Sequence, residues 1–303
     1  MANEEHLSRL KWGNGAWREW RVQDPQMIPD LRQANLRNAD LESINFSGAD
    51  LEQAYLLAAC LVKANLRQAK LCKANLYEAD LTHADLTEAE MVNAHLIGAT
   101  LTGAELRGAN LRGADLREAI LIHADLSLAD LIGTDLRHAN LTQADLSDAN
   151  LTRTEFDRAR LIAVNFSGAN LSRANLHQAE LMEVNLSRAS LYKTILVHAK
   201  LVGASLFAAT LIEANLSGAD LSWANLSRAN LFGAKLDRAK LRGANLSRAD
   251  LRHANLQGAN LQGANLHRAN FAGANLQNAD LFNTDLSTAN LQNAIMPDNI
   301  LHP

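Results

Sequence analysis

The sequence predicts an all-β solenoid, and three observations lead to this fold class. An apolar residue, mostly Leu, recurs at every fifth position from Leu31 to Met296 without a slip in phase. Ala usually stands two residues before each of these centres, and Asn or Asp stands directly before it. Aromatic residues make up only 5% of the chain, so the core must be built from thin layers of small and medium side chains.

A period of five residues fits neither one long helix nor a straight strand. A helix turns by about 100° per residue, so successive centres would be offset by about 140° and would spread around the whole cylinder. Side chains of a straight strand alternate between two faces, so an odd period would expose every second leucine. The chain must therefore turn once in each repeat, and a solenoid with one repeat per side is the simplest closed solution.

The repeated phrase A(D/N)LXX, as in HANLQGANLQGANLHRANFAGANLQ at 253–277, resembles the signature of the pentapeptide-repeat family. The resemblance covers about nine-tenths of the chain. It implies a right-handed quadrilateral parallel β-helix with four repeats per coil, and hence about 13 coils. The period alone fixes neither the handedness nor the number of sides.

Within such a coil, each position of the repeat has a physical reason. Ala is needed because two inward rows share a narrow bore at the packing density of a protein interior. Stacked coils pair through backbone hydrogen bonds about 4.8 Å apart. Gly at the second variable position, as at Gly103, Gly108 and Gly113, is expected to ease a corner turn with positive φ.

We expect a helical cap over residues 1–28, the β-helix over 29–296 and a tail over 297–303. If Ile300 and Leu301 do not cover the last coil, two copies could form a homodimer through this C-terminal end.

The first 28 residues break the repeat and read as a short amphipathic helix. Asn3 is the expected N-cap, and Asp24-Pro25 ends the helix. Gly13 and Gly15 weaken its middle, so two short pieces are an alternative. The apolar residues expected to cover the first coil are Leu7, Leu10, Trp12, Trp17 and Trp20. The alternative is a docking helix, and similar Trp-containing leaders occur in some cyanobacterial members of the family that the chain resembles.

The sequence offers no set of residues for catalysis. It has no CxxC, HExxH or phosphate-binding glycine loop. No insertion interrupts the repeats, and inserted loops are where solenoid enzymes commonly carry their sites. His83 and His123 would lie about 9.6 Å apart along the axis, too far for one zinc ion. We therefore expect no enzyme, no catalytic residue, no cofactor and no metal.

Two cysteines, Cys60 and Cys72, give no disulfide framework, so a cytoplasmic location is expected. No apolar run is long enough to span a membrane, and no signal peptide is recognisable at the N-terminus.

Charge is distributed unevenly along the chain. Residues 1–150 carry 14 Lys and Arg against 22 Asp and Glu, whereas residues 151–303 carry 15 against 11. Residues 20 apart should stack on one side. The candidate partner-binding residues then form an acidic row (Asp85, Glu105, Asp125, Asp145), an interrupted arginine row (Arg188, Arg228, Arg248, Arg268) and a second basic row (Arg153, Arg173, Lys193).

Three functions remain open. The first is a non-enzymatic scaffold that binds an unidentified protein partner along its faces. The second is a DNA mimic that acts on DNA gyrase, as some members of the family do, although this chain turns basic after about residue 150. The third is weak, salt-sensitive nucleic-acid binding by the Arg-rich second half. A solvated surface without a partner is the alternative to all three.

Overall fold

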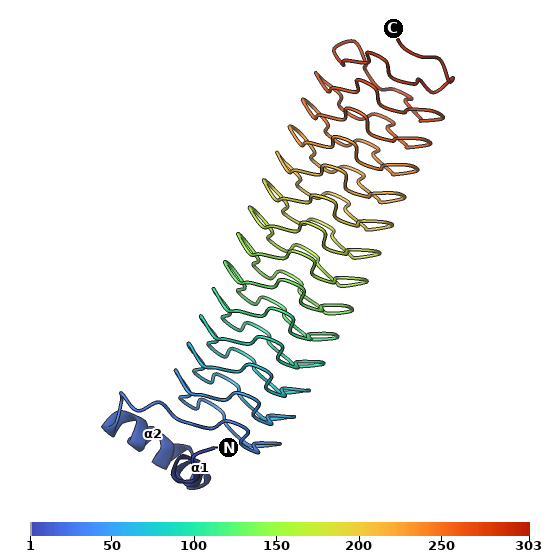
Figure 1. Ribbon diagram of the computed structural model, residues 1–303. Coiled ribbons are helices and arrows are strands. Elements are labelled where there is room, and N and C mark those ends of the chain that lie inside the picture. The colour runs from blue at the N-terminus through green and yellow to red at the C-terminus, as the bar shows by residue number, and fades with distance from the viewer. Residues whose placement is uncertain (1) are drawn as a thin grey trace. The chain divides into compact units, whose positions relative to one another are not determined.

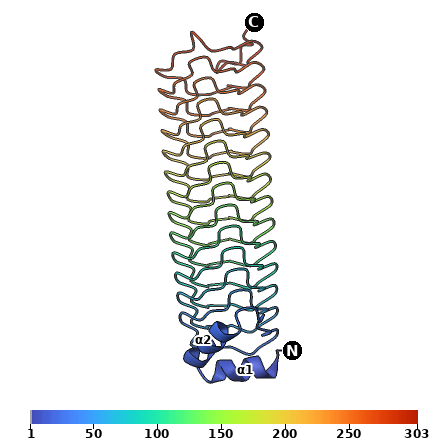
Figure 2. The ribbon, with the colours of Figure 1, turned by 90° about the vertical axis from the view of Figure 1, so that its left-hand side faces the viewer.

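The computed structural model describes residues 2–303. The chain divides into two compact units, Met1–Asn150 and Leu151–Pro303. In each unit the chain winds into stacked coils (Figures 1 and 2). Two helices, α1 (Glu4–Lys11) and α2 (Asn14–Gln23), precede the coils of the first unit. Each unit is described by itself. The division into 1–28, 29–296 and 297–303 stays a prediction.

Parallel pairing joins residues that are 20 positions apart. In the first unit the bridges run from Asp30↔Asp50 to Asp130↔Asn150, and in the second from Glu155↔Asn175 to Asn275↔Ile295. Twenty residues are four repeats, so each coil consists of four repeats, as the resemblance implied. Between residues 2 and 303 these pairs are isolated bridges rather than longer strands, because the chain turns after every bridging residue. The count of about 13 coils stays a prediction.

In a repeat such as 51–55, whose centre follows Asp50, all five backbone N–H groups find acceptors. The apolar centre and the second variable residue donate to the next coil, the residue before the centre donates to the previous coil, and Ala closes the corner turn. In the repeat 51–55 these bonds are Leu51 to Lys70 (2.8 Å), Gln53 to Cys72 (2.9 Å), Tyr55 to Ala34 (2.9 Å) and Ala54 to Leu51 (2.9 Å). The fifth N–H, of Glu52, donates to Oδ1 of Asp50 at 3.1 Å. Asn or Asp therefore precedes the centre because its side chain satisfies the one donor that the coils leave free.

The core of each unit consists of the inward Leu and Ala rows, which are almost completely buried. Thr134, Thr154 and Thr194 replace Ala and are buried too, and a buried hydroxyl must find an acceptor. Thr134 Oγ1 donates to the carbonyl of Leu111 at 2.8 Å, and Thr194 Oγ1 donates to the carbonyl of Leu171 at 2.7 Å. The core thus accepts a hydroxyl because the backbone of the preceding coil lies within reach.

The corners confirm the expected positive φ, which is 63° at Gly103 and 66° at Gly108. The same conformation also occurs at residues other than glycine, such as Arg228 at 60° and Trp223 at 63°. Charged side chains at the second variable position therefore leave the corner from a left-handed backbone.

The cap forms two helices, the alternative that Gly13 and Gly15 suggested. Asn3 is the N-cap of α1, as predicted, and its side chain accepts the N–H of Glu5 at 2.9 Å. Helix α2 ends at Gln23 with Asp24 as its C-cap, as the Asp-Pro signal predicted.

Tryptophans contribute unequally to the cap. Trp17 is completely buried, its ring meets that of Phe46 edge-on at 5.3 Å, and its Nε1–H donates to the carbonyl of Asn45 at 2.9 Å. Trp20 and Leu10 are also buried, and Leu7 is half-buried.

The expectation that Trp12 covers the core is wrong, because this side chain is 72% exposed. Trp12 is the C-cap of α1, and the chain changes direction at Gly13 (φ 97°) before α2 begins. Helical spacing also places Trp12 about 140° from Leu7 and about 160° from Leu10, so even a single continuous helix would turn it away from their face.

Two polar residues, His6 and Arg21, tie the cap to the coils. His6 is buried, its Nδ1 accepts the N–H of Asp30 at 3.0 Å, and its ring lies 4.9 Å from that of Trp20. Arg21 donates to the carbonyls of Met27 at 2.6 Å and Ser47 at 2.8 Å, and burial lowers its pKa.

After the last repeat the chain turns back on itself. Ile295 and Leu301 form an antiparallel bridge, and the N–H of Met296 donates to the carbonyl of Ile300 at 2.8 Å. The side chains of Ile300 and Leu301 nevertheless stay exposed, as does Phe282.

Candidate functional site

Backbone bridges place the acidic row in consecutive coils of the first unit. Asp85 pairs with Glu105, Glu105 with Asp125, and Asp125 with Asp145. Like charges stacked at about 4.8 Å repel one another unless they are paired. Arg67 lies 3.5 Å from Asp85, and this ion pair relieves one end of the row.

All three aspartates of the acidic row also have a backbone role, and Asp85 accepts the N–H of Thr87 at 3.0 Å. Asp125 accepts the N–H of Ser127, and Asp145 accepts the N–H of Ser147, both at 2.8 Å. Glu105 is exposed. The acidic row is thus partly a consequence of the corner turns.

The second basic row lies in the second unit. Arg153, Arg173 and Lys193 each donate their backbone N–H to the next coil through the same bond, shifted by 20 residues. Lys193 Nζ lies 3.2 Å from Oε2 of Glu213, and hydrogen bonds to Tyr192 and Glu213 raise the pKa of Lys193. One of the three cations of this row is therefore already neutralised.

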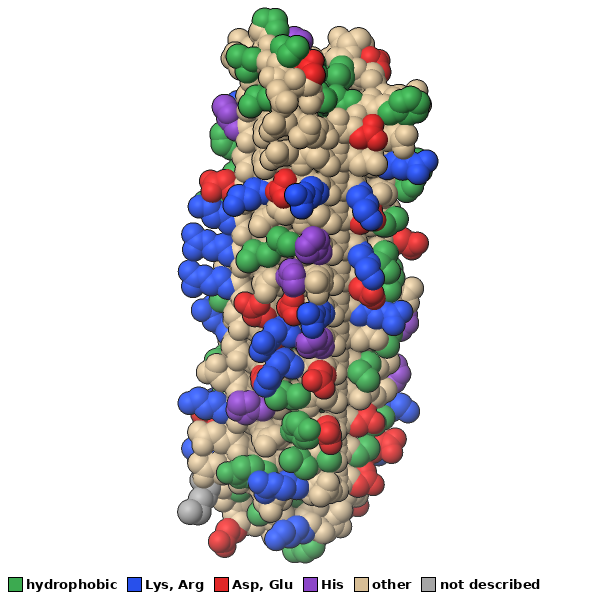
Figure 3. Space-filling model, turned by 90° about the vertical axis from the view of Figure 1, so that its right-hand side faces the viewer, with side chains coloured by type: hydrophobic (Ala, Val, Ile, Leu, Met, Phe, Trp, Pro, Cys, Tyr) green, Lys and Arg blue, Asp and Glu red, His purple; other side chains and the backbone are tan. Residues whose placement is uncertain are grey.

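The arginine row occupies the second variable position on another side of the second unit. Ala208 interrupts it between Arg188 and Arg228. The guanidinium of Arg228 lies 5.9 Å from the ring centre of Phe207, a cation–π contact. No carboxylate pairs with the guanidiniums of this row among residues 2–303. Figure 3 shows basic side chains that stand one above another along the left edge of the view.

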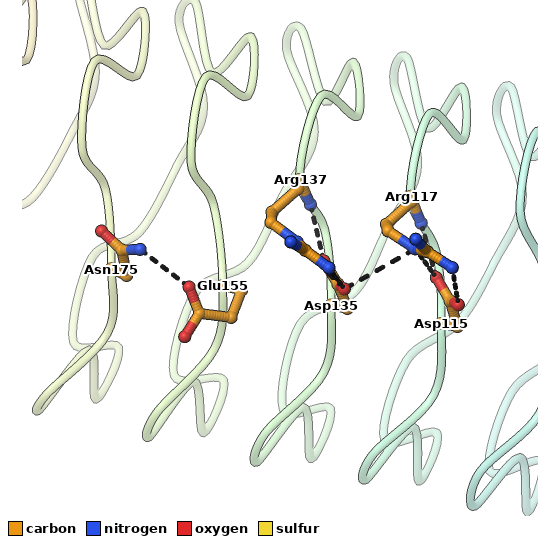
Figure 4. Close-up of polar contacts among 6 residues, drawn as sticks. All are labelled: Asp115, Arg117, Asp135, Arg137, Glu155 and Asn175. Carbon is orange, nitrogen blue, oxygen red and sulfur yellow. Dashed lines mark hydrogen bonds and ion pairs between the residues drawn. The ribbon is translucent and has the colours of Figure 1, made fainter.

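Among residues 2–303, 11 of the 29 Lys and Arg residues pair with a carboxylate. Figure 4 shows Arg117 bound to Asp115 of its own repeat, with Nη2 2.7 Å from Oδ2, and its Nε 3.7 Å from Asp135 of the next coil. Burial raises the pKa of Asp115, but the hydrogen bonds from Arg117 outweigh it and the pKa is lowered. Cations with a carboxylate partner are Arg9, Arg32, Arg67, Arg112, Arg117, Arg137, Arg158, Lys193, Lys200, Lys240 and Arg252.

A shallow groove of about 430 Å³ lies beside the arginine row, and we call it the arginine groove. Its lining residues are Ser227, Arg228, Ser247, Arg248, Asn265 and His267. All six are half-buried or exposed, so the groove is open to solvent.

From residue 2 to residue 303, no three His, Cys, Asp or Glu side chains are grouped so that they could hold a metal ion. Over the same residues, no helix is long and apolar enough to cross a membrane.

A family model described as pentapeptide repeats (8 copies) matches the chain in overlapping segments, from 30–68 at one end to 259–297 at the other. The chain belongs to the pentapeptide-repeat family. Proteins of this family fold as right-handed quadrilateral β-helices, the fold class that the resemblance implied.

Among solved structures, the chain is similar to HetL, a pentapeptide repeat protein involved in heterocyst differentiation regulation from the cyanobacterium Nostoc sp. strain PCC 7120. The two are 41% identical over 75% of this chain and 91% of HetL, with a TM-score of 0.54. Rfr23 from the cyanobacterium Cyanothece 51142 is 38% identical over 32% of this chain and 58% of its own, with a TM-score of 0.16. QnrB1, a plasmid-mediated fluoroquinolone resistance protein, is 19% identical over 64% and 84%, with a TM-score of 0.25. No curated protein matches the chain significantly.

Proposed function

We propose that the protein is a non-enzymatic, cytoplasmic scaffold that binds a protein partner along its charged faces. The observation that carries this proposal is the arginine row, whose guanidiniums have no carboxylate partner within the described chain. Arginine is enriched at protein interfaces, where its planar group binds carboxylates and phosphates in pairs of hydrogen bonds.

The contrast with the paired cations supports this role. Arg117 and Arg252 each reach a carboxylate of their own repeat at 2.7 Å. In the arginine row, by contrast, the positions directly before the centres are Asn225, Asn245 and Asn265, which carry no charge. The row therefore presents positive charge outward, where it can attract an acidic partner.

The test is capture of proteins from a lysate of the source organism with the tagged chain at low and high salt. The double variant Arg228→Glu and Arg248→Glu should lose a stoichiometric partner that high salt also removes. The matched control, Arg238→Glu and Arg242→Glu, makes the same charge change at exposed arginines outside the row and should keep it. Equal capture by both variants would refute the proposal.

DNA mimicry toward DNA gyrase is the second candidate, and the acidic row favours it. Bridges stack Asp85, Glu105, Asp125 and Asp145 in consecutive coils of the first unit. A supercoiling assay with purified gyrase decides this point, because a mimic should inhibit or protect the enzyme in proportion to its concentration. No effect at large excess removes the candidate.

We also propose a homodimer through the C-terminal end. The exposed apolar side chains of Phe282, Ile300 and Leu301 support this contact.

A further inference from the structure

We propose that the arginine groove binds the phosphate monoester of a phosphorylated Ser or Thr in an extended segment of the partner. The inference rests on the proposed function, because the partner carries the phosphate. The inference goes further than the proposed function because it names the chemical group that the arginine row binds.

The groove exists because of the side chains at the first variable position of this side. In successive coils these are Phe207, Ser227, Ser247 and His267. Two small residues therefore lie between two rings, and the row of arginines forms a wall beside them. With about 4.8 Å between coils, the space above the serines suits one tetrahedral anion rather than a large planar ligand.

Some of the hydrogen-bond donors around this space are free. The hydroxyl of Ser227 donates to Oδ1 of Asn225 at 2.6 Å, but the hydroxyl of Ser247 has no partner among the described residues. The guanidiniums of Arg228 and Arg248 stand on adjacent coils without a carboxylate. An anion in the groove would thus meet two cations and a hydroxyl within one coil spacing.

His267 can supply one more donor at the far end of the groove. The hydroxyl of Thr288 accepts the backbone N–H of Arg268 at 3.1 Å and lies 3.2 Å from Nδ1 of His267. When that hydroxyl donates its own hydrogen to Nδ1, the ring hydrogen lies on Nε2. Nε2–H then remains a donor for a ligand.

The charge of the site favours a phosphate monoester over a carboxylate. A phosphorylated side chain carries about −1.5 to −2 at pH 7 and offers three acceptor oxygens. Two arginines balance that charge, whereas one carboxylate would leave one of them uncompensated. A phosphodiester of a nucleic acid has a single charge for each group, so it fits the pair of arginines less well.

The open shape favours a group presented by a peptide over a free metabolite. Pockets for small molecules bury most of the ligand surface. In the arginine groove Arg228, Arg248 and His267 are exposed, and Ser227 and Ser247 are half-buried. A phosphate held here would gain further contacts only if the chain that carries it continued along the coils.

The experiment is a titration of the isotope-labelled full chain with an Ala-Gly peptide that bears one phosphoserine, followed by NMR. The parallel ligands are the unphosphorylated peptide, inorganic phosphate and a single-stranded oligonucleotide. We expect the phosphopeptide to bind most tightly and to shift the amide signals of Ser227, Ser247 and His267. Arg228→Ala with Arg248→Ala should weaken it by about 10- to 100-fold, the usual effect of losing charge-assisted hydrogen bonds. Arg238→Ala with Arg242→Ala should not weaken it.

Four outcomes would overturn the inference: equal binding of the unphosphorylated peptide, tighter binding of inorganic phosphate, tighter binding of the oligonucleotide, or equal loss in the control variant. The result also separates the two proposals. If the charge reversals abolish partner capture but the phosphopeptide does not bind, the scaffold function stands and the phosphate site is wrong. If the phosphopeptide binds but no partner is lost on charge reversal, the phosphate site stands and the scaffold function is wrong.

Discussion

The side chain that precedes each leucine has a role in the backbone as well as on the surface. Asp125 and Asp145 each accept the N–H of the residue two positions later, so Asp or Asn at this position stabilises the corner. Glu105, whose side chain is one carbon longer, stands in the same row without that bond. Of the acidic row, Glu105 is therefore the residue whose charge the fold explains least.

At the residue scale, one prediction concerns the stacking of Trp223 on Gly243. A Cβ at Gly243 would lie 2.4 Å from two atoms of the Trp223 ring, whereas one at Gly263 would meet nothing within 4 Å. Both glycines have the same left-handed backbone, with φ of 65° and 64°. Gly263→Ala should therefore cost only the conformational strain, about 1 kcal/mol.

Gly243→Ala should cost about 1 to 3 kcal/mol more, because the indole must move as well. Chemical denaturation measures the cost, and the indole N–H signal of Trp223 reports the movement. Equal costs in the two variants would show that the ring does not rest on Gly243.

A second prediction at this scale is the acid stability of the Asp30–Arg32 pair. The hydrogen bond from Arg32 lowers the pKa of Asp30 to about 2, against an ordinary value of about 3.9 in an unfolded chain. A carboxyl whose pKa is lowered on folding stabilises the fold above the unfolded value, and this contribution is lost as pH falls through the folded value. The relevant window is therefore about pH 4 down to pH 2.

Arg32→Ala should raise the pKa of Asp30 toward its ordinary range, which an NMR titration of the carboxyl measures directly. The variant should be less stable than the native chain at pH 6, and the difference should shrink toward pH 2. A difference in unfolding free energy that stayed constant across this window would contradict the assignment.

At the scale of the elements, the cap shows what the sequence could and could not predict. Asn3 and Asp24 are local signals that act on their own helix, and both were predictable. Helical spacing groups Trp17 with Leu7 and Leu10 and turns Trp12 to the opposite side, so the burial of Trp17 and the exposure of Trp12 were predictable too. Nδ1 of His6 accepts the N–H of Asp30, 24 residues away, and no sequence pattern predicts such a contact.

The two tryptophans therefore make a matched pair of variants. Trp17→Ala removes a completely buried ring and leaves the carbonyl of Asn45 without its donor, so it should cost about 3 to 5 kcal/mol. Trp12→Ala removes a ring that is mostly exposed, so it should change stability by about 0.5 kcal/mol or less. Thermal unfolding followed by circular dichroism compares them, and hydrogen exchange at residues 31–50 locates the effect. Equal effects would mean that α2 does not cover the first coil.

At the scale of the whole molecule, the five-residue period predicted the solenoid. A spacing of 20 residues predicted which charged residues stack in the acidic row, the arginine row and the second basic row. Pairing within the rows could not be predicted the same way. Lys193 was grouped with Arg153 and Arg173, but its ammonium reaches Glu213 at 3.2 Å in the next coil. Whether a cation stays free depends on side-chain directions and on neighbours 18 to 20 residues away, as for Arg67 and Asp85 or Lys200 and Glu180.

The last prediction concerns self-association, for which the molecule offers two physical routes. Residues 1–150 carry an excess of acid and residues 151–303 an excess of base, so copies could attract one another through charge. That attraction falls steeply with salt, since the screening length shrinks to about 3 Å at 1 M ionic strength. The proposed C-terminal homodimer instead buries Phe282, Ile300 and Leu301, and burial of apolar surface is not screened by salt.

We therefore expect sedimentation velocity to detect a dimer that persists at about 1 M salt. Phe282→Asp should convert it to monomer at all salt concentrations, because the carboxylate would be buried without a partner. Val22→Asp, at an exposed apolar residue of α2, is the matched control and should leave the dimer intact. A dimer that dissociated at high salt but persisted in the Phe282→Asp variant would show that charge attraction, not the C-terminal apolar side chains, holds the copies together.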